Sequence, residues 1–139
     1  MRPRFLLALD VDGTLLTRDG RVAQRDARAL ERARRAGIAV TLASGRQPAG
    51  LWPLAEALGL VHPLVAVDGG LIVGARSRRE LQRAPLPRPV AAPLVEGWRT
   101  RGLSVFFMTA DAIVARRVDH ARFPFIGSWS PIAAQTDDP

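Results

Sequence analysis

The stretch FLLALDVDGTL, residues 5–15, decides the fold class of this chain. It opens with the apolar run Phe5–Leu9, and a continuous run of this length predicts a strand that is buried on both faces. Side chains two residues apart on an extended strand point to the same side, so Asp10 and Asp12 project together where the strand ends. Gly13 then permits a sharp turn of the backbone.

The two aspartates need a partner because neighbouring carboxylates repel each other and are costly to desolvate. A shared cation or proton reduces both costs, and Thr14 adds a hydroxyl and an amide beside them. This combination is typical of a hard-cation site with a carboxylate nucleophile. Asp and Gly are also ordinary turn residues, so an acidic turn is the alternative. The apolar run before the motif and the residues after it favour the functional interpretation.

Strand and helix periodicities alternate through the first half of the chain. The predicted elements are a strand at 5–9, a helix at 23–36, a strand at 38–43, a helix at 48–58 and a strand at 63–67. Strands that alternate with helices in this way predict an α/β fold with a doubly wound, Rossmann-like parallel sheet.

The pattern changes after residue 70. A short strand at 71–73 and a proline-rich connector precede a predicted helix at 90–100 and a hairpin formed by residues 103–108 and 112–114. We therefore expect two units, a core unit at residues 1–70 and a smaller α+β unit at residues 71–139 that ends in an irregular tail.

The segment Ser44-Gly45-Arg46 follows the second predicted strand and precedes the second predicted helix. Ligands of open α/β sheets bind at the carboxyl ends of the strands. A hydroxyl, a glycine amide and a helix N-terminus together predict an anion site there. The alternative is that Ser44 only caps the helix, since Ser is a preferred N-cap residue.

The first of these motifs resembles the hydrophobic strand and Asp-x-Asp-Gly-Thr-Leu pattern of the haloacid dehalogenase superfamily of phosphohydrolases. The resemblance implies that Asp10 is the nucleophile, which forms an aspartyl-phosphate, and that Asp12 is the general acid and base. It implies a Mg²⁺ ion held by the Asp10 carboxylate and the Asp12 backbone carbonyl. Gly13 and Thr14 join the phosphate-binding residues in this interpretation.

The second motif is similar to the Ser/Thr-Gly-Arg segment of the Cof-like, type IIB capped members, in which Ser44 and the Gly45 amide would bind the transferring phosphoryl group. Two roles stay open for Arg46, namely contact with substrate and an ion pair with a nearby carboxylate. Asp68 stands where those members have Asn, so it is a substrate-contact candidate and equally a turn residue. The resemblance implies the N-terminal half of the family's α/β core followed by the start of its α+β cap.

The amino-acid composition limits the kinds of metal site, membrane association and nucleic-acid binding that we expect of this chain. The chain has 139 residues, 47% hydrophobic content and no cysteine, so thiolate metal sites are excluded. No run is long enough to span a membrane, and a cytoplasmic location is the default expectation. All 20 basic residues are Arg, and a stripe of them on the first predicted helix is compatible with a nucleic-acid footprint. Such stripes are more often solvated, so nucleic acid is not the favoured partner.

Two motifs of the family have no counterpart here. The sequence contains no Lys and no Gly-Asp-x-x-x-Asp segment. The sequence therefore predicts a truncated member, or one half of a split protein whose missing C-terminal half or complementing chain supplies these groups. The expected function is Mg²⁺-dependent hydrolysis of a small phosphorylated metabolite, such as a sugar phosphate, with weak or no turnover by this chain alone. A non-catalytic phosphate- or metal-binding module is the alternative.

Overall fold

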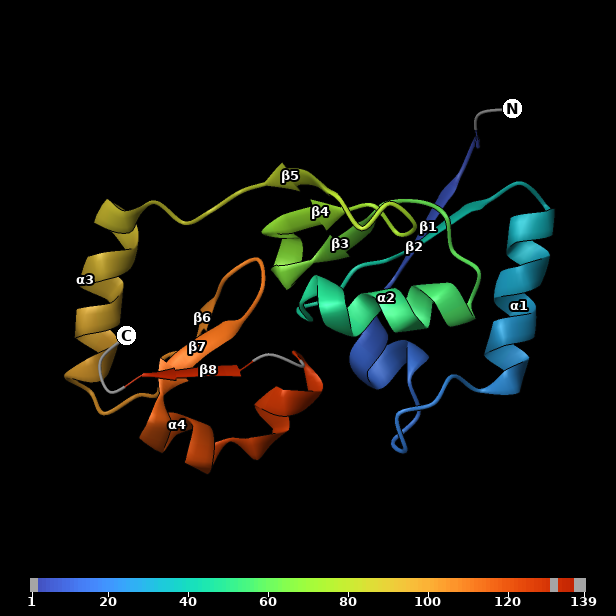
Figure 1. The fold of residues 1–139 in the computed structure, drawn as a ribbon. Coiled ribbons are helices and arrows are strands. Elements are labelled where there is room, and N and C mark those ends of the chain that lie inside the picture. The colour runs from blue at the N-terminus through green and yellow to red at the C-terminus, as the bar shows by residue number, and fades with distance from the viewer. Residues whose placement is uncertain (1–2, 131–132, 137–139) are drawn as a thin grey trace.

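Alternating strands and helices build the first half of the chain (Figure 1). The computed structural model describes residues 3–130 and 133–136. The order is β1 (Leu6–Leu9), α1 (Gln24–Arg35), β2 (Ala39–Leu42), α2 (Pro48–Ala57) and β3 (Leu64–Ala66). β1 pairs with β2 in parallel, and a parallel bridge between Ala43 and Val65 joins β2 to β3. The predicted α/β class with parallel strands is confirmed.

Local sequence signals set the helix boundaries. Pro48 occupies the first turn of α2, where its missing N–H costs nothing. Gly37 follows α1 with φ of +80° and Gly59 follows α2 with φ of +63°, a region that L-residues rarely adopt. The predicted boundaries of both helices therefore agree with the observed ones to within one residue.

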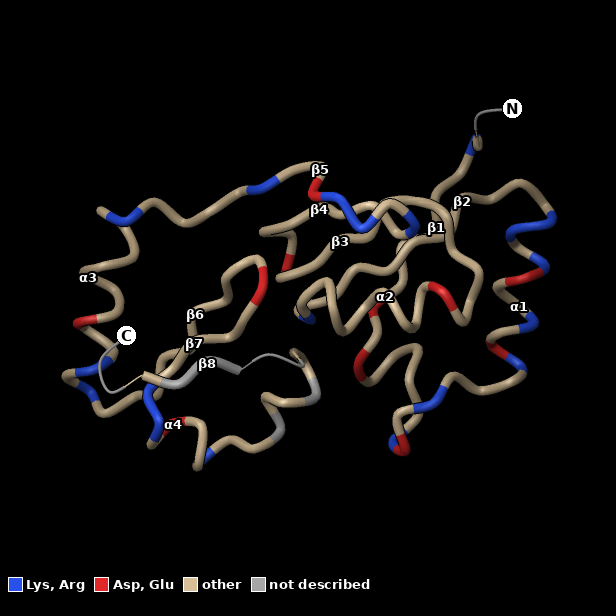
Figure 2. The backbone as a smooth tube through the Cα atoms, in the orientation of Figure 1, with Lys and Arg blue, Asp and Glu red and all other residues tan. Residues whose placement is uncertain are grey.

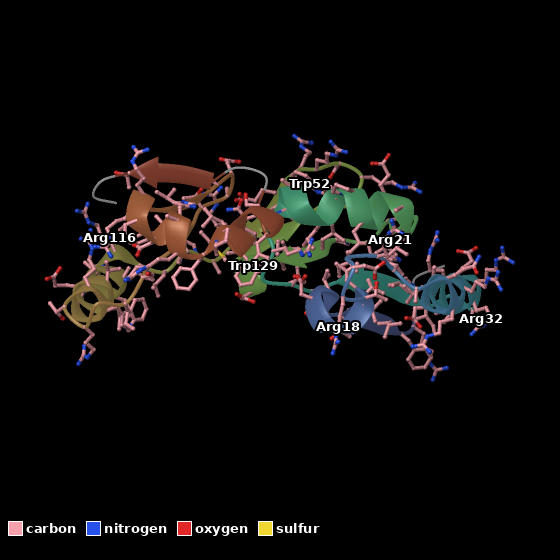
Figure 3. The ribbon with its side chains drawn as sticks, turned by 90° about the horizontal axis from the view of Figure 1, so that it is seen from below. Arg18, Arg21, Arg32, Trp52, Arg116 and Trp129 are labelled. Carbon is pink, nitrogen blue, oxygen red and sulfur yellow. The ribbon has the colours of Figure 1, made fainter. Side chains whose placement is uncertain are left out.

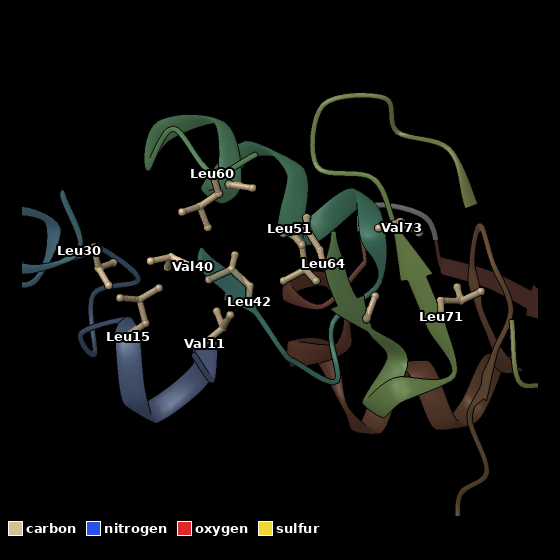
Figure 4. Packing of buried hydrophobic residues seen from close by; sticks show 12 residues of the cluster. Val11, Leu15, Leu30, Val40, Leu42, Leu51, Leu60, Leu64, Leu71 and Val73 are labelled. Carbon is tan, nitrogen blue, oxygen red and sulfur yellow. The ribbon is translucent and has the colours of Figure 1, made fainter. Parts of the chain in front are cut away.

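One hydrophobic cluster holds these elements together (Figure 4). The side chains of Leu42, Leu51 and Leu64, from β2, α2 and β3, are fully buried within it. In Figure 4 the cluster runs from Leu30 at one end to Val73 and Leu71 at the other. β2 is buried along its whole length because α1 and α2 both contact it. The cluster fixes the ends of the three parallel strands relative to one another.

The prediction that the first strand is buried on both faces is wrong. Phe5 and Leu6 are 63% and 66% exposed, and exposure alternates along β1. Only Leu7 and Leu9 pack against the core cluster. The reason is position in the sheet, because within the described residues β1 pairs with β2 alone and is an edge strand.

The second half forms two antiparallel pairings and a small mixed sheet. Its elements are β4 (Leu71–Val73), β5 (Glu80–Arg83), α3 (Arg88–Arg99), β6 (Phe107–Met108), β7 (Ile113–Arg116), α4 (Arg117–Arg122) and β8 (Ala133–Thr136). β4 and β5 extend β3 as a meander, while β6, β7 and β8 form a sheet that lies beside α3 and α4 in Figure 1. The hairpin of β6 and β7 confirms the predicted one, in shorter form.

Two strands of the second half depart from the sequence expectation. β5 consists of exposed residues without an apolar alternation, so no pattern indicated it. β8 pairs in parallel with β7 where an irregular tail was expected, and the end of that tail, residues 137–139, lies outside the described residues. No helix in the described part of the chain is both long and apolar enough to cross a membrane.

A buried carboxylate stabilises the second half. The side chain of Asp119 is 1% exposed and accepts hydrogen bonds from Arg116 Nε at 2.8 Å and Ser104 Oγ at 2.6 Å. The Arg116 guanidinium holds the pKa of this carboxyl below its usual value, although burial acts in the opposite direction. Replacing it removes charge-assisted hydrogen bonds, so we expect Asp119→Asn to lower the free energy of unfolding by about 2 kcal/mol at pH 7.

The pH dependence of this effect has a defined sign. Because the folded-state pKa of Asp119 is depressed, its stabilisation is complete above the unfolded value of about 3.9 and is lost as the pH falls through the folded value. Denaturant unfolding of both proteins from pH 7 to pH 3 should therefore show a difference that shrinks in acid. A difference that stays constant over this range would contradict the assignment.

Candidate active site

Three loops meet at the carboxyl ends of β1, β2 and β3. They are residues 10–15, 44–47 and 67–69, and together they contain every site residue predicted from the sequence. Those residues are Asp10, Asp12, Gly13, Thr14, Ser44, Gly45, Arg46 and Asp68. Parallel strands that end at the same edge of a sheet bring such loops together.

The loop after β1 is a single wide turn. The Leu16 N–H donates to the Val11 carbonyl at 2.9 Å, and Gly13 adopts φ of +76°, which a side chain would strain. Val11 and Leu15 anchor the turn in the core. The Thr14 hydroxyl donates to Asp10 Oδ2 at 2.7 Å and thereby orients that carboxylate.

The loop after β2 does not place Ser44 at the N-cap position of α2, which was the alternative role for this residue. α2 begins at Pro48 and Gln47 is its N-cap residue, so Ser44 does not cap the helix. Ser44 is 8% exposed, and its Oγ accepts the Arg46 N–H at 3.2 Å. Residues 44–47 thus connect β2 to α2, and the helix begins at Pro48 as predicted.

The loop after β3 is conformationally strained and closes over the second loop. Val67, Asp68 and Gly69 have φ of 52°, 50° and 92°, and the first is a β-branched residue, for which this region is costly. The Asp68 N–H donates to the Ser44 carbonyl at 3.2 Å, and the Val67 N–H donates to the Arg46 carbonyl at 3.0 Å.

The same loop places a carboxylate beside Gly45. A Cβ at position 45 would lie 3.0 Å from Asp68 Oδ1, so the absence of a side chain at Gly45 makes room for Asp68. Asp68 is therefore both a turn residue and a neighbour of the candidate phosphate-binding loop.

Arg46 forms a bidentate ion pair with Asp12. Its Nε donates to Asp12 Oδ2 at 2.7 Å and its Nη2 donates to Oδ1 at 2.6 Å. These hydrogen bonds lower the pKa of Asp12, with burial opposing them. Of the two roles left open for Arg46, the structure shows the ion pair with a carboxylate. The arrangement keeps Asp12 ionised, which suits a base, whereas an acid needs its proton.

The first loop offers few oxygen ligands for Mg²⁺. Thr14 occupies one oxygen of Asp10, and Arg46 occupies both oxygens of Asp12. The described residues contain no group of three or more His, Cys, Asp or Glu side chains that could hold a metal ion. Mg²⁺ is often bound by one or two carboxylates with several waters and substrate phosphates, so the Asp10 carboxylate and a backbone carbonyl are compatible with it.

A buried polar junction next to Arg46 was not predicted. Gln47 is 1% exposed; its Nε2 donates to the Thr109 carbonyl at 2.9 Å, and its Oε1 accepts the Ser130 hydroxyl at 2.5 Å. Its N–H donates to the Trp129 carbonyl at 3.2 Å. In Figure 3, Trp129 lies in the middle of the molecule. No sequence signal could have identified this junction, because its members lie 62 and 83 residues from Gln47.

The arginines of the described residues are distributed over several elements of the fold. Figure 2 shows them on α1, before β5, at the ends of α3 and on α4. On α1, Glu31 pairs with Arg34 and Arg35 at 2.9 Å each. The positive charge on this helix is thus partly neutralised by its own acidic residue.

Comparisons with known proteins agree on one family for this chain. Residues 7–132 match the model of the family described as haloacid dehalogenase-like hydrolase. The chain is 30% identical over 109 residues to the pyridoxal phosphate phosphatase YbhA of Escherichia coli. The aligned region covers 78% of this chain and 40% of that protein. It is 33% identical over 96 residues to the HMP-PP phosphatase of Serratia proteamaculans, covering 68% of this chain and 35% of that protein.

A solved structure agrees with these sequence matches. The crystal structure of a haloacid dehalogenase-like hydrolase from Bacteroides thetaiotaomicron matches with a TM-score of 0.73 and 28% identity, covering 96% of this chain and 52% of that one. The chain spans about half or less of the length of the curated relatives that it matches.

Proposed function

Since the chain belongs to the haloacid dehalogenase-like hydrolases, we propose that it carries the nucleophile and phosphate-binding loops of a Mg²⁺-dependent phosphohydrolase site. The observation that carries this proposal is the approach of the Asp10–Asp12 loop to the Ser44–Arg46 loop through the ion pair of Arg46 with Asp12. Two carboxylates and an anion-binding turn thereby share one end of the sheet.

The proposed reaction proceeds in two displacements at phosphorus. A free oxygen of the Asp10 carboxylate attacks the phosphoryl group and the bond to the leaving oxygen breaks. Asp12, which must first leave Arg46 and take up a proton from solvent, gives that proton to the leaving oxygen. Asp12 then takes a proton from water, which attacks the phosphorus, releases inorganic phosphate and regenerates Asp10. Thr14 orients the nucleophile through its hydrogen bond to Oδ2, and Ser44 with the Gly45 amide holds the phosphoryl oxygens.

The Asp10 carboxylate and the Asp12 backbone carbonyl would hold Mg²⁺. When bound, the ion offsets negative charge that Asp10 and the phosphoryl group bring together. The chain has no Lys to do so.

The proposed substrate is a small phosphorylated metabolite. Two relatives named as phosphatases of pyridoxal phosphate and HMP-PP support this class. A sugar phosphate belongs to the same class of substrate.

The test is hydrolysis of p-nitrophenyl phosphate by the 139-residue chain, with Mg²⁺ and with EDTA. We expect slow turnover that requires Mg²⁺, because Arg46 is the only basic residue in the three loops. In addition, the described residues contain no group of three or more His, Cys, Asp or Glu side chains that could hold the ion. Intact-mass spectrometry after incubation with acetyl phosphate and Mg²⁺ provides a second measurement, the phosphoryl adduct. Neither turnover nor adduct would reject a catalytic role.

A non-catalytic module is the second candidate function. The observation that favours it is the bidentate ion pair of Arg46 with Asp12, which holds both carboxylate oxygens of the proposed acid and base and lowers its pKa. Phosphate or Mg²⁺ binding, measured by NMR shifts of the three loops, without turnover or adduct would identify this function.

A further inference from the structure

Positive charge is scarce at the three loops. The segments 10–15, 44–47 and 67–69 contain the three aspartates Asp10, Asp12 and Asp68, and Arg46 is the only basic residue in them. Within these segments, Arg46 is therefore the one cationic side chain available to a phosphate dianion that enters beside Ser44 and Gly45. Both guanidinium hydrogen bonds that the structure shows for Arg46 go to Asp12.

The side chain of Arg46 can change partner while its backbone stays in place. Its N–H donates to Ser44 Oγ, and its carbonyl accepts the Val67 N–H. The aliphatic part of the side chain passes the first turn of α2, where a Cβ on Gly50 would lie 3.7 Å from Arg46 Cδ. The backbone is thus held at both ends of the residue, and rotation of the side chain alone redirects the guanidinium.

Resting on the proposed function, we infer that Arg46 is an exchange residue, held by Asp12 in the empty site and taken over by the phosphoryl group of the bound substrate. The same guanidinium thereby blocks Asp12 when no substrate is present and releases it when a phosphate arrives. Arg46 acts on Asp12 through this exchange, so it is a positioning residue for the acid and base and a ligand of the phosphate.

A double-mutant cycle on the 139-residue chain tests the exchange, with inorganic phosphate as the probe at fixed Mg²⁺ and constant pH. Asp12→Asn cannot hold Arg46 as an ion pair, so it should tighten phosphate binding about tenfold. In the Arg46→Gln background the same Asp12 substitution should change affinity by about twofold or less, because no guanidinium is left to release. Isothermal titration calorimetry gives all four dissociation constants.

The control separates exchange from a simple loss of negative charge. Asp10→Asn removes a neighbouring carboxylate that does not bind Arg46, so its effect on phosphate affinity should be equal in both backgrounds. Asp12→Ala serves as a second variant, and tryptophan fluorescence confirms the fold of each protein.

Two different results would overturn the inference. If Asp12→Asn and Asp12→Ala tighten phosphate binding equally with Arg46 and with Gln at that position, Arg46 does not exchange, while the proposed phosphate site stands. If no variant binds phosphate, the proposed function fails together with the inference that rests on it.

Discussion

Asp10→Asn should reduce Mg²⁺-dependent phosphatase activity by about 10³-fold or more and abolish the phosphoryl adduct. An amide is a far poorer nucleophile than a carboxylate and carries no charge for Mg²⁺. The substitution is nearly isosteric, and the amide oxygen can still accept the Thr14 hydroxyl that orients Asp10. Loss of activity would therefore reflect loss of the nucleophile, with the turn after β1 intact.

The same substitution at an aspartate outside the site provides the control for Asp10→Asn. Asp26 lies in the first turn of α1, outside the three loops, and its carboxylate approaches Arg25 at 3.4 Å. Asp26→Asn should leave both hydrolysis and adduct formation at the wild-type level. Adduct formation by Asp10→Asn at the wild-type rate would show that another residue is the nucleophile.

Gln47→Leu should lower the free energy of unfolding by about 3 kcal/mol, the second large effect. Leu fills a similar volume but cannot bond to the Thr109 carbonyl or to the Ser130 hydroxyl, which Gln47 joins at 2.9 and 2.5 Å. Burying polar groups without their partners costs about 1–3 kcal/mol each. Denaturant unfolding followed by tryptophan fluorescence measures this loss.

The exposed Gln82 on β5 provides the control. Gln82→Leu should change the free energy of unfolding by about 0.5 kcal/mol or less, since no buried group depends on its side chain. Equal stability of Gln47→Leu and the wild-type protein would show that the junction does not stabilise the fold. A large loss would establish that residues 109 and 130 are tied to the start of α2, directly beside Arg46.

The sequence predicted the parallel first half well because its signals are local. Glycines after both helices, Pro48 at the start of the second and the largely apolar second strand each indicate the conformation of their own neighbourhood. The prediction failed for β1, whose apolar residues give the same pattern whether or not the sheet continues beside them. It also missed β5, whose exposed residues carry no periodic signal.

Some features of the candidate site could likewise be predicted from the sequence, and others could not. The motif residues could be placed at strand ends from the sequence, because every one directly follows a predicted strand. The partner of Arg46 could not be predicted from the sequence, because Asp12 lies 34 residues away and a guanidinium binds a carboxylate or a phosphate equally well. Whether Ser44 capped a helix also depended on where the helix began, which is the least certain feature of a periodic pattern.

The sequence by itself determined the family resemblance, the alternation of strands and helices along the first half of the chain, and the identity of the chemical groups at the strand ends. Those properties depend on residue types and short-range spacing, which the chain carries without being folded. Only the tertiary structure decided that Arg46 engages Asp12, that Asp68 lies against Gly45 and that Gln47 joins the two halves of the chain. These contacts form only after the cluster around Leu42 and Leu64 has brought distant loops within hydrogen-bonding distance.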